Sequence, residues 1–216
     1  MILENKKILI TAGPTQEHID PVRFISNKSS GKMGFAIASA AIYYGGDVTL
    51  ISGPVNLNSI PGVKQIDVEN AHDMSLAIKN EINKNKFDVI IMAAAVADYS
   101  PDKIADQKIK SNKNTLELTL DKNIDILKSI SNYQALKIGF ALETSNGEKN
   151  AIKKMQDKGL DYILLNYANE KNAGFEGDLN HLYLFSKTGY KKEFETDTKI
   201  RLARTILKTI FQNGKK

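Results

Sequence analysis

The sequence predicts an α/β fold with a Rossmann-like, doubly wound and mostly parallel sheet. Short apolar runs alternate with helical segments through the first half of the chain. The run 87–96 is apolar almost throughout, as in a central parallel strand covered on both faces. A chain of 216 residues can bury one substantial core, so we expect a single domain over residues 1–216.

The first half supplies strands and helices in alternation. We expect strands at 7–11, 47–52, 64–68 and 87–96, and helices at 32–44 and 71–86. Gly45 and Gly46 follow the first helix, as expected at a helix C-terminus. Met74, Ile78 and Ile82 recur at helical spacing in the second helix. This order of elements predicts right-handed crossovers between parallel strands.

The second half differs, because a lysine-rich stretch interrupts the alternation. Residues 103–113 predict an extended arm or flap, and 116–120 alternates like a half-exposed strand. Further expected elements are strands at 137–142 and 161–165, a helix near 147–158, a hairpin of 181–186 with 191–195, and a closing helix at 198–211. The predicted architecture is therefore a doubly wound sheet with an added arm.

Composition excludes several classes of protein. No apolar run reaches the roughly 18 residues of a membrane span, and residues 1–7 lack the apolar stretch of a signal peptide. The chain has no cysteine, which excludes disulfides and thiolate metal sites and fits a cytoplasmic location. The formal net charge is +5, but the lysines are scattered, so we expect neither a nucleic-acid nor a membrane partner.

The loop after the first predicted strand is long and polar. It lies at the carboxyl end of that strand, where ligands bind in open parallel sheets. Its last part, 26–34, is rich in Ser, Asn and Gly, whose hydroxyl and backbone N–H groups suit an anion. Simple helix capping explains the same residues, and both interpretations stay open. Met33 follows Gly31-Lys32 where a P-loop requires Ser or Thr, so a P-loop is excluded.

Two later segments carry charged candidates. Asp98 follows the small residues 93–97, which let a ligand approach the backbone, although a carboxylate here could simply cap a turn. Lys108 and Lys110 point to the same side if the chain is extended, either toward a ligand or toward solvent. A ligand-binding role and a surface role stay open for these residues.

A lysine pair on the predicted helix 147–158 is a further candidate. Lys154 and Lys158 share one helical face, where they repel unless an anion lies between them or both face solvent. The histidines His18, His72 and His181 show no metal-binding spacing. Taken alone, these residues indicate an anion- or nucleotide-binding α/β enzyme and name no reaction.

Several stretches together resemble the phosphopantothenate–cysteine ligase family, the bacterial type that is often fused behind a flavin-dependent decarboxylase. The order and spacing match over almost the whole chain, and the block 20–34 is the most specific. The matching stretches are ITAGPT (10–15), DPVRFISNKSSGKMG (20–34), AAAVAD (93–98), KIK (108–110), GFALET (139–144) and the pair Lys154 and Lys158. No decarboxylase portion is present, so the resemblance implies a stand-alone ligase or an excised domain.

The resemblance implies an amide-forming reaction of coenzyme A biosynthesis. 4′-Phosphopantothenate would react with CTP to form an acyl-cytidylate and pyrophosphate, and L-cysteine would then displace CMP. The bacterial type favours CTP over ATP. Mg²⁺ would bridge the triphosphate, mostly through phosphate oxygens and water, and its protein ligands stay unknown.

The matched motifs also imply roles for particular residues. Asn27 would hold and orient the acyl intermediate, and Lys108 would neutralise phosphate charge from a mobile flap. Nucleotide contacts would come from Asp98, Lys108, Ile124, Asp125, Ile126, Leu127, Phe140, Lys154 and Lys158, and substrate contacts from Arg23, Asn27, Ser29 and Ala94.

The resemblance further implies a homodimer. The region 108–120 would be exchanged or paired across the interface, and Arg23 would serve the partner's site. An NAD(P)-dependent oxidoreductase on a similar sheet is the alternative function, although the G-x-G-x-x-G turn of such enzymes is missing.

Overall fold

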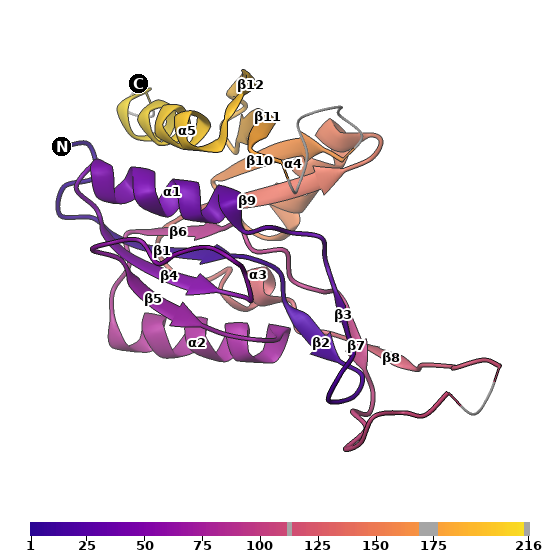
Figure 1. Cartoon of the computed structure of the whole chain (residues 1–216). Helices are drawn as coiled ribbons and strands as arrows, with labels where there is room; N and C mark the ends of the chain where they lie inside the picture. The colour runs from indigo at the N-terminus through magenta and orange to yellow at the C-terminus, as the bar shows by residue number, and fades with distance from the viewer. Residues whose placement is uncertain (112–113, 169–176, 214–216) are drawn as a thin grey trace.

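One eight-stranded sheet organises the chain, and the computed structural model describes residues 1–111, 114–168 and 177–213. Its strands are β1 (Lys7–Ala12), β4 (Asp47–Ser52), β5 (Lys64–Asp67), β6 (Val89–Met92), β9 (Leu136–Glu143), β10 (Tyr162–Tyr167), β11 (Leu179–Ser186) and β12 (Lys191–Thr198). Their order is β12-β11-β10-β9-β6-β1-β4-β5 (Figure 1). The strands from β5 to β10 pair in parallel, and β11 and β12 are antiparallel additions. The mostly parallel sheet is confirmed.

Helices cover both faces of this sheet. α1 (Lys32–Tyr43) and α5 (Lys199–Asn213) lie side by side on one face, and α2 (Ala71–Lys84), α3 (Ile126–Ser129) and α4 (Gly147–Asp157) cover the other (Figure 1). Alternation along the strands divides the core accordingly. Ile8 and Ile10 are buried with residues of α1 and α5, whereas Leu9 is buried with residues of α2. The predicted doubly wound arrangement is therefore confirmed.

The carboxyl ends of the parallel strands form one edge of the sheet, which we call the carboxyl edge. Because β11 and β12 run antiparallel, β11 begins and β12 ends at this same edge, where Leu179 pairs with Thr198. The segments that enter β11 and leave β12 therefore join the loops in which α/β proteins bind their ligands.

Most predicted elements are confirmed within two residues at their ends, but three differences stand out. The apolar run 87–96 forms a strand only over Val89–Met92, and the chain then leaves the sheet. The expected strand at 116–120 is wrong, because only Leu120–Lys122 (β8) pairs with another strand. The short helix α3 was not predicted, because four residues show no helical periodicity.

The predicted arm projects from the body of the molecule (Figure 1). Its base is a short antiparallel pair of β7 (Tyr99–Pro101) with β8, and it lies near a hairpin of β2 (Gln16–His18) with β3 (Phe24–Ser26). Residues 112 and 113 of the predicted arm lie outside the described residues. An extended antiparallel arm is thus part of the fold.

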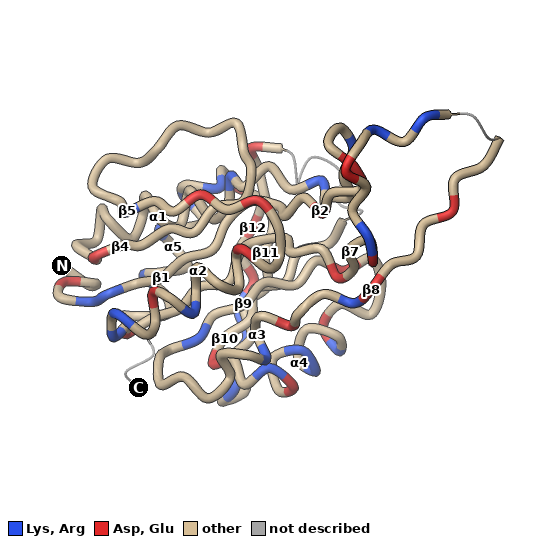
Figure 2. Tube along the Cα trace, turned by 90° about the horizontal axis from the view of Figure 1, so that it is seen from below, with Lys and Arg blue, Asp and Glu red and all other residues tan. Residues whose placement is uncertain are grey.

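Charge and hydropathy of the described chain agree with a globular α/β fold. Lysine and arginine are interleaved with aspartate and glutamate along the trace (Figure 2). None of the helices in the described part of the chain is long and apolar enough to cross a membrane.

Candidate functional site

A cavity of about 690 Å³ opens at the carboxyl edge of the sheet. This volume lies in the range of small-molecule sites, roughly 300–1,000 Å³. Its walls come from residues 27–34, 92–98, 122–127 and 140–142, and from Lys154, Lys158, Asn166, Ala168, Asn180 and Lys199. A second depression of about 660 Å³ beside α4 is more open to solvent, and none of the predicted site residues is among those lining it.

Asn27 is oriented by the backbone on the opposite wall. Its side-chain amide nitrogen donates hydrogen bonds to the carbonyl oxygens of Ala95 and Val96, at 3.0 and 3.2 Å. Carbonyl oxygens only accept, so the NH₂ group must face them. No described residue donates a hydrogen bond to Oδ1 of Asn27. The acceptor oxygen Oδ1 is therefore left available in the cavity wall.

The small-residue loop 93–97 is held against the loop that follows β1. The hydroxyl of Thr15 accepts from the backbone N–H of Ala97 at 2.9 Å, and the hydroxyl of Thr11 accepts from the N–H of Ala94 at 3.2 Å. Asn123 fastens the far end, because its side chain donates to the carbonyl of Ala97 at 2.9 Å. These bonds explain why the apolar run stops being a strand after Met92.

The N-terminus of α1 points into the cavity without a side-chain cap. Its N-cap residue, Gly31, has a φ of 74° and offers no side-chain oxygen. Ser29 accepts instead from the N–H of Gly31, at 3.3 Å. The capping alternative for residues 26–34 is therefore not what this helix uses, and the positive end of the helix faces the cavity.

Gly34 allows α1 to lie directly on β1. A Cβ atom at this position would lie 2.5 Å from the Cβ of Ala12. Two non-bonded carbon atoms cannot approach so closely, so a glycine is needed here for close helix–strand packing. The same packing brings residues 27–33 over the cavity.

Lys154 of α4 and Lys158, the residue directly after this helix, line another part of the cavity wall. The ammonium of Lys154 donates to the carbonyl oxygen of Phe140 at 2.9 Å. Burial lowers the pKa of Lys154, and the carboxylates of Glu143 and Asp98 oppose that effect. Lys158 forms an ion pair with Asp125, whose other oxygen caps α3 by accepting from the N–H of Lys128 at 3.0 Å. Burial raises the pKa of Asp125, but these hydrogen bonds outweigh it and lower the pKa overall.

The arm is fastened to the β2–β3 hairpin by a buried carboxylate. Asp20 is fully buried and accepts from the backbone N–H groups of Val22 and Arg23 at 2.8 and 2.9 Å. It also accepts from the N–H of Ile109 at 3.1 Å and from the guanidinium of Arg23, which in turn donates to the carbonyl of Ile109 at 2.9 Å. The guanidinium holds the pKa of Asp20 far below its usual range.

This attachment determines where two predicted site residues lie. Arg23 is bound to Asp20, and Lys108 is exposed on the arm beside Ile109, so neither lines the cavity. The cavity wall does include the other predicted residues: Asn27, Ser29, Ala94, Asp98, Ile124, Asp125, Ile126, Leu127, Phe140, Lys154 and Lys158. The roles assigned to all of them stay predictions.

Some residues of the site were not predicted. Thr15 and Asn123 hold the loop 93–97, and Asn180 and Lys199 reach the cavity from β11 and α5. The position of Thr15 in the loop that follows the first strand indicates a site residue, because ligands bind in such loops. Asn180 and Lys199 gave none, because their position depends on the antiparallel addition of β11 and β12.

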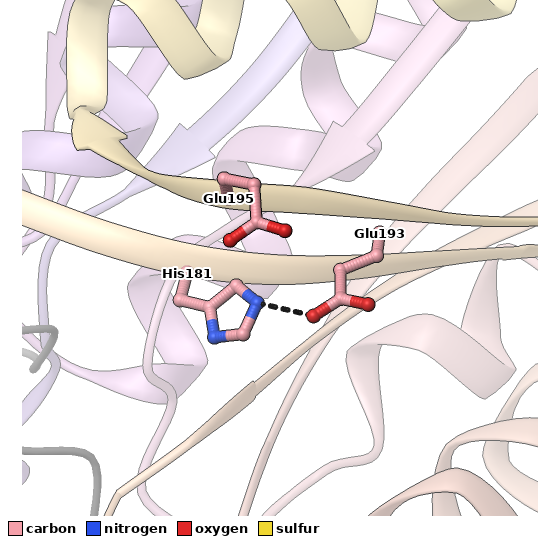
Figure 3. Close-up of side chains that lie close together, drawn as sticks. All are labelled: His181, Glu193 and Glu195. Atoms are coloured by element: carbon pink, nitrogen blue, oxygen red, sulfur yellow. Dashed lines mark hydrogen bonds and ion pairs between the residues drawn. The ribbon is translucent and has the colours of Figure 1, made fainter.

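Strand pairing also brings His181 close to Glu193 and Glu195, within 4.8 Å of one another at their ligand atoms (Figure 3). His181 and Glu193 are joined by a 2.9 Å hydrogen bond. The two glutamates are exposed, and none of the three residues lines the cavity. The cluster forms an ordinary polar surface of the β11–β12 hairpin.

The fold and the cavity together define the class of the protein: an α/β protein with a lysine-bearing cavity at the carboxyl edge of its sheet, where such folds bind their ligands. Comparison with known proteins identifies the family. Residues 3–213 match the DNA/pantothenate metabolism flavoprotein C-terminal domain, and the chain belongs to this family. The resemblance seen in the sequence is thereby confirmed.

Named relatives agree with this family. The chain is 42% identical over 211 residues to the coenzyme A biosynthesis bifunctional protein CoaBC of Bacillus subtilis, covering 96% of this chain and 52% of that protein. It is 43% identical over 195 residues to the CoaBC protein of Escherichia coli K12, covering 88% of this chain and 48% of that protein. The chain thus spans about half the length of these relatives.

Solved structures show the same fold. The crystal structure of the C-terminal domain of a CoaBC protein superposes with a TM-score of 0.83 at 39% identity, covering 99% of this chain and 98% of that chain. The DNA/pantothenate metabolism flavoprotein from Streptococcus pneumoniae has a TM-score of 0.79 at 24% identity, covering 96% and 99%. The second likeness concerns the fold alone.

Proposed function

We propose that the chain is a phosphopantothenate–cysteine ligase that works in coenzyme A biosynthesis and uses CTP. The observation that carries this proposal is the cavity in which Asn27, the N-terminus of α1 and the lysines Lys154 and Lys158 converge. Family membership and the name of the CoaBC relatives support it. The proposed reaction requires no protein nucleophile in the cavity, since its work is positioning and charge neutralisation.

In the first step, the carboxylate of 4′-phosphopantothenate attacks the α-phosphorus of CTP. A phosphorus–oxygen bond to the β-phosphate breaks, pyrophosphate leaves with the electron pair, and an acyl-cytidylate forms. The ammonium of Lys154 and the ion-paired Lys158 would offset the phosphate charge, and the N–H groups at the start of α1 face the same space. Phe140 and residues 124–127 would contact the nucleoside.

In the second step, the amine of L-cysteine attacks the acyl carbon. The carbon–oxygen bond to the phosphate breaks, CMP leaves, and the amine loses a proton as the amide forms. Oδ1 of Asn27 is the acceptor that can orient an N–H group of the reactants, because Ala95 and Val96 already engage its NH₂ group. Ser29 and Ala94 lie close by in the wall for contacts with phosphopantothenate.

The cavity also has a group suited to Mg²⁺. Asp98 lies in its wall, and no described residue forms a hydrogen bond or ion pair with its carboxylate. Mg²⁺ binds to proteins through one or two carboxylates together with phosphate oxygens and water. Asp98 would hold the ion, which when bound would neutralise charge on the triphosphate.

The alternative function, an NAD(P)-dependent oxidoreductase, is not supported. The family match runs from residue 3 to residue 213 and includes the loop after β1. That loop contains a hairpin of β2 with β3 in place of a glycine-rich dinucleotide turn.

We further propose that the chain works as a homodimer. Four apolar side chains of the arm expose 40–63% of their surface: Ile104, Leu116, Leu118 and Leu120. A group of exposed apolar side chains is typical of a surface that another molecule covers. A second copy would cover them, and Lys108 of the arm and Arg23 of the β2–β3 hairpin would then lie beside a partner's cavity. Residues 1–216 would act as one ligase domain in the cytoplasm.

Pyrophosphate release tests the proposed function. The wild-type chain should release pyrophosphate from CTP only with phosphopantothenate, and form the amide only when cysteine is added. Asn27→Asp should still release pyrophosphate but fail to couple cysteine, because a carboxylate cannot donate to Ala95 and Val96 and would turn away. Normal amide formation by this variant would refute the role of Asn27.

A further inference from the structure

Two asparagines on neighbouring strands form an uncharged polar part of the cavity wall. Asn166 lies near the end of β10 and Asn180 near the start of β11, and both line the cavity. The two strands are adjacent in the sheet (Figure 1) and pair in antiparallel register, with Leu165 opposite Tyr183. Continuing this register places Asn166 opposite Leu182, two residues along from Asn180. The two asparagines are therefore diagonal neighbours across the strands, close enough to contact one ligand group.

Both side chains belong to the same face of the sheet. Side chains alternate between the faces along a strand, so Asn166 follows Leu164 and Asn180 precedes Leu182 on the face that α1 and α5 cover. Leu164 and Leu182 are fully buried in the core on that face. Met33 of α1 packs against this core and also lines the cavity. The asparagines thus lie where the apolar core ends and the cavity begins.

The amide groups of these asparagines are buried without a full set of hydrogen-bond partners. Asn166 exposes only 6% of its surface, and none of the described residues forms a hydrogen bond with its side chain. Asn180 exposes 4%, and its Oδ1 accepts from the backbone N–H of His181 at 3.1 Å. Its NH₂ group therefore points away from that bond, and no residue of the described chain accepts from it. A buried amide without a partner costs free energy, which a ligand would recover.

We propose that Asn166 and Asn180 form a subsite for an uncharged hydroxyl or amide group of a substrate. The NH₂ group of Asn180 donates, and the amide of Asn166 donates or accepts, so one hydroxyl or one secondary amide satisfies both. The inference rests on the proposed function and deepens it. Phosphopantothenate carries a hydroxyl and a secondary amide, and CTP carries the hydroxyls of its ribose. A site built to hydrogen-bond such a group discriminates against compounds that lack it.

Asn166→Leu tests the subsite, because leucine has a similar volume and cannot form hydrogen bonds. Asn132→Leu is the matched control, at an exposed position that does not line the cavity. We expect Asn166→Leu to raise the KM of one substrate about three- to tenfold. Its urea midpoint should stay the same or rise, because an unpaired buried amide is removed. A raised KM for phosphopantothenate would assign the subsite to its hydroxyl or amide, and a raised KM for CTP to the ribose. Unchanged KM values for both substrates would overturn the proposal.

Calorimetry with CTP alone and with phosphopantothenate alone supplies a readout that does not depend on turnover. Asn180→Ser is the second variant, since it removes the NH₂ group, keeps a small polar side chain and provides the test if Asn166→Leu does not fold. Both variants should bind the same compound about three- to tenfold more weakly than wild type and Asn132→Leu do. A wild-type chain that forms no amide, but binds one compound through these asparagines, would refute the proposed ligase and leave the subsite standing. Equal binding by all four proteins, or no binding by wild type, would remove the subsite, whatever the activity.

Discussion

Replacing Lys154 with methionine separates binding from stability at the proposed nucleotide end of the cavity. Lys154 is a half-buried residue of α4, and its ammonium donates to the carbonyl of Phe140 at 2.9 Å. Methionine has a similar length and retains the apolar contacts of the side-chain stem. The variant therefore removes one buried charge and its hydrogen bonds and leaves the volume nearly unchanged.

The expected magnitude follows from the proposed hydrogen bond between the Lys154 ammonium and a nucleotide phosphate, which methionine cannot form. A hydrogen bond from a charged donor contributes about 1.5–3 kcal/mol, which corresponds to a roughly 10- to 150-fold higher KM for CTP. Stability should change little. The bond to Phe140 is removed, but the desolvation that lowers the pKa of Lys154 is relieved at the same time. We expect a free energy of unfolding within about 1 kcal/mol of wild type.

Steady-state kinetics and urea unfolding measure the two effects on the same protein. Lys153→Met is the control, because Lys153 directly precedes Lys154 on α4, is exposed and does not line the cavity. The control should leave both quantities unchanged. A Lys154→Met protein of normal stability and normal KM for CTP would show that this ammonium faces no nucleotide phosphate.

Three further predictions concern pH, the arm and the packing of α1. Because burial lowers the pKa of Lys154 from 10.5, its positive charge is lost as the pH rises through that lowered value. In a series of KM measurements at rising pH, the KM for CTP should therefore start to increase before pH 10.5 is reached. Lys154→Arg keeps its charge in this range and should abolish the early increase. Asp20→Asn should speed hydrogen exchange of the arm around Ile109, with Asp106→Asn as an exposed control. Because the pKa of Asp20 lies far below 3.8, wild type should keep the attachment through pH 3.8 and lose it only on much stronger acidification, as the pH falls through that lowered pKa. Unchanged exchange in Asp20→Asn would show that the arm is held elsewhere. Gly34→Val should lower the free energy of unfolding by about 1–3 kcal/mol, because the new Cβ atom would collide with Ala12. Urea unfolding measures this quantity, and a free energy within about 0.5 kcal/mol of wild type would contradict the packing of α1 on β1.

Local sequence patterns predicted the central sheet and its helices well, because the burial of apolar side chains determines where these elements form. The runs 7–11 and 47–52 are apolar strands on which helices pack from both sides, and they occur as β1 and β4. The run 87–96 shows the limit of this reasoning. Its apolar character continues to residue 97, but the backbone of 93–97 bonds to Thr11, Thr15 and Asn27, which are distant in sequence. No local pattern reports such partners.

The arm could be predicted in outline but not in detail. The alternation of residues 116–120 predicts a strand that buries one face, yet Leu116 and Leu118 are exposed and pair with no strand of the described chain. An apolar face within one chain and an apolar face awaiting a second copy give the same sequence pattern. The prediction failed because alternating apolar residues indicate one apolar face and do not identify a strand that pairs with it; the proposed second copy is one surface that would bury this face.

The ion pair of the buried Asp20 with Arg23 connects the arm and the cavity, which the sequence treated separately. The specific block 20–34 begins with the carboxylate that holds Ile109 and continues to the N-terminus of α1. One continuous segment therefore attaches the arm at one end and lines the cavity at the other. Because Asn27 lies between them and bonds to the loop 93–97, a shift of the arm would be transmitted to the wall where the acyl-cytidylate is proposed to form. The position of Lys108 and the orientation of Asn27 are thus set by the same short stretch of backbone, which gives a physical reason for this block to be the most specific part of the sequence.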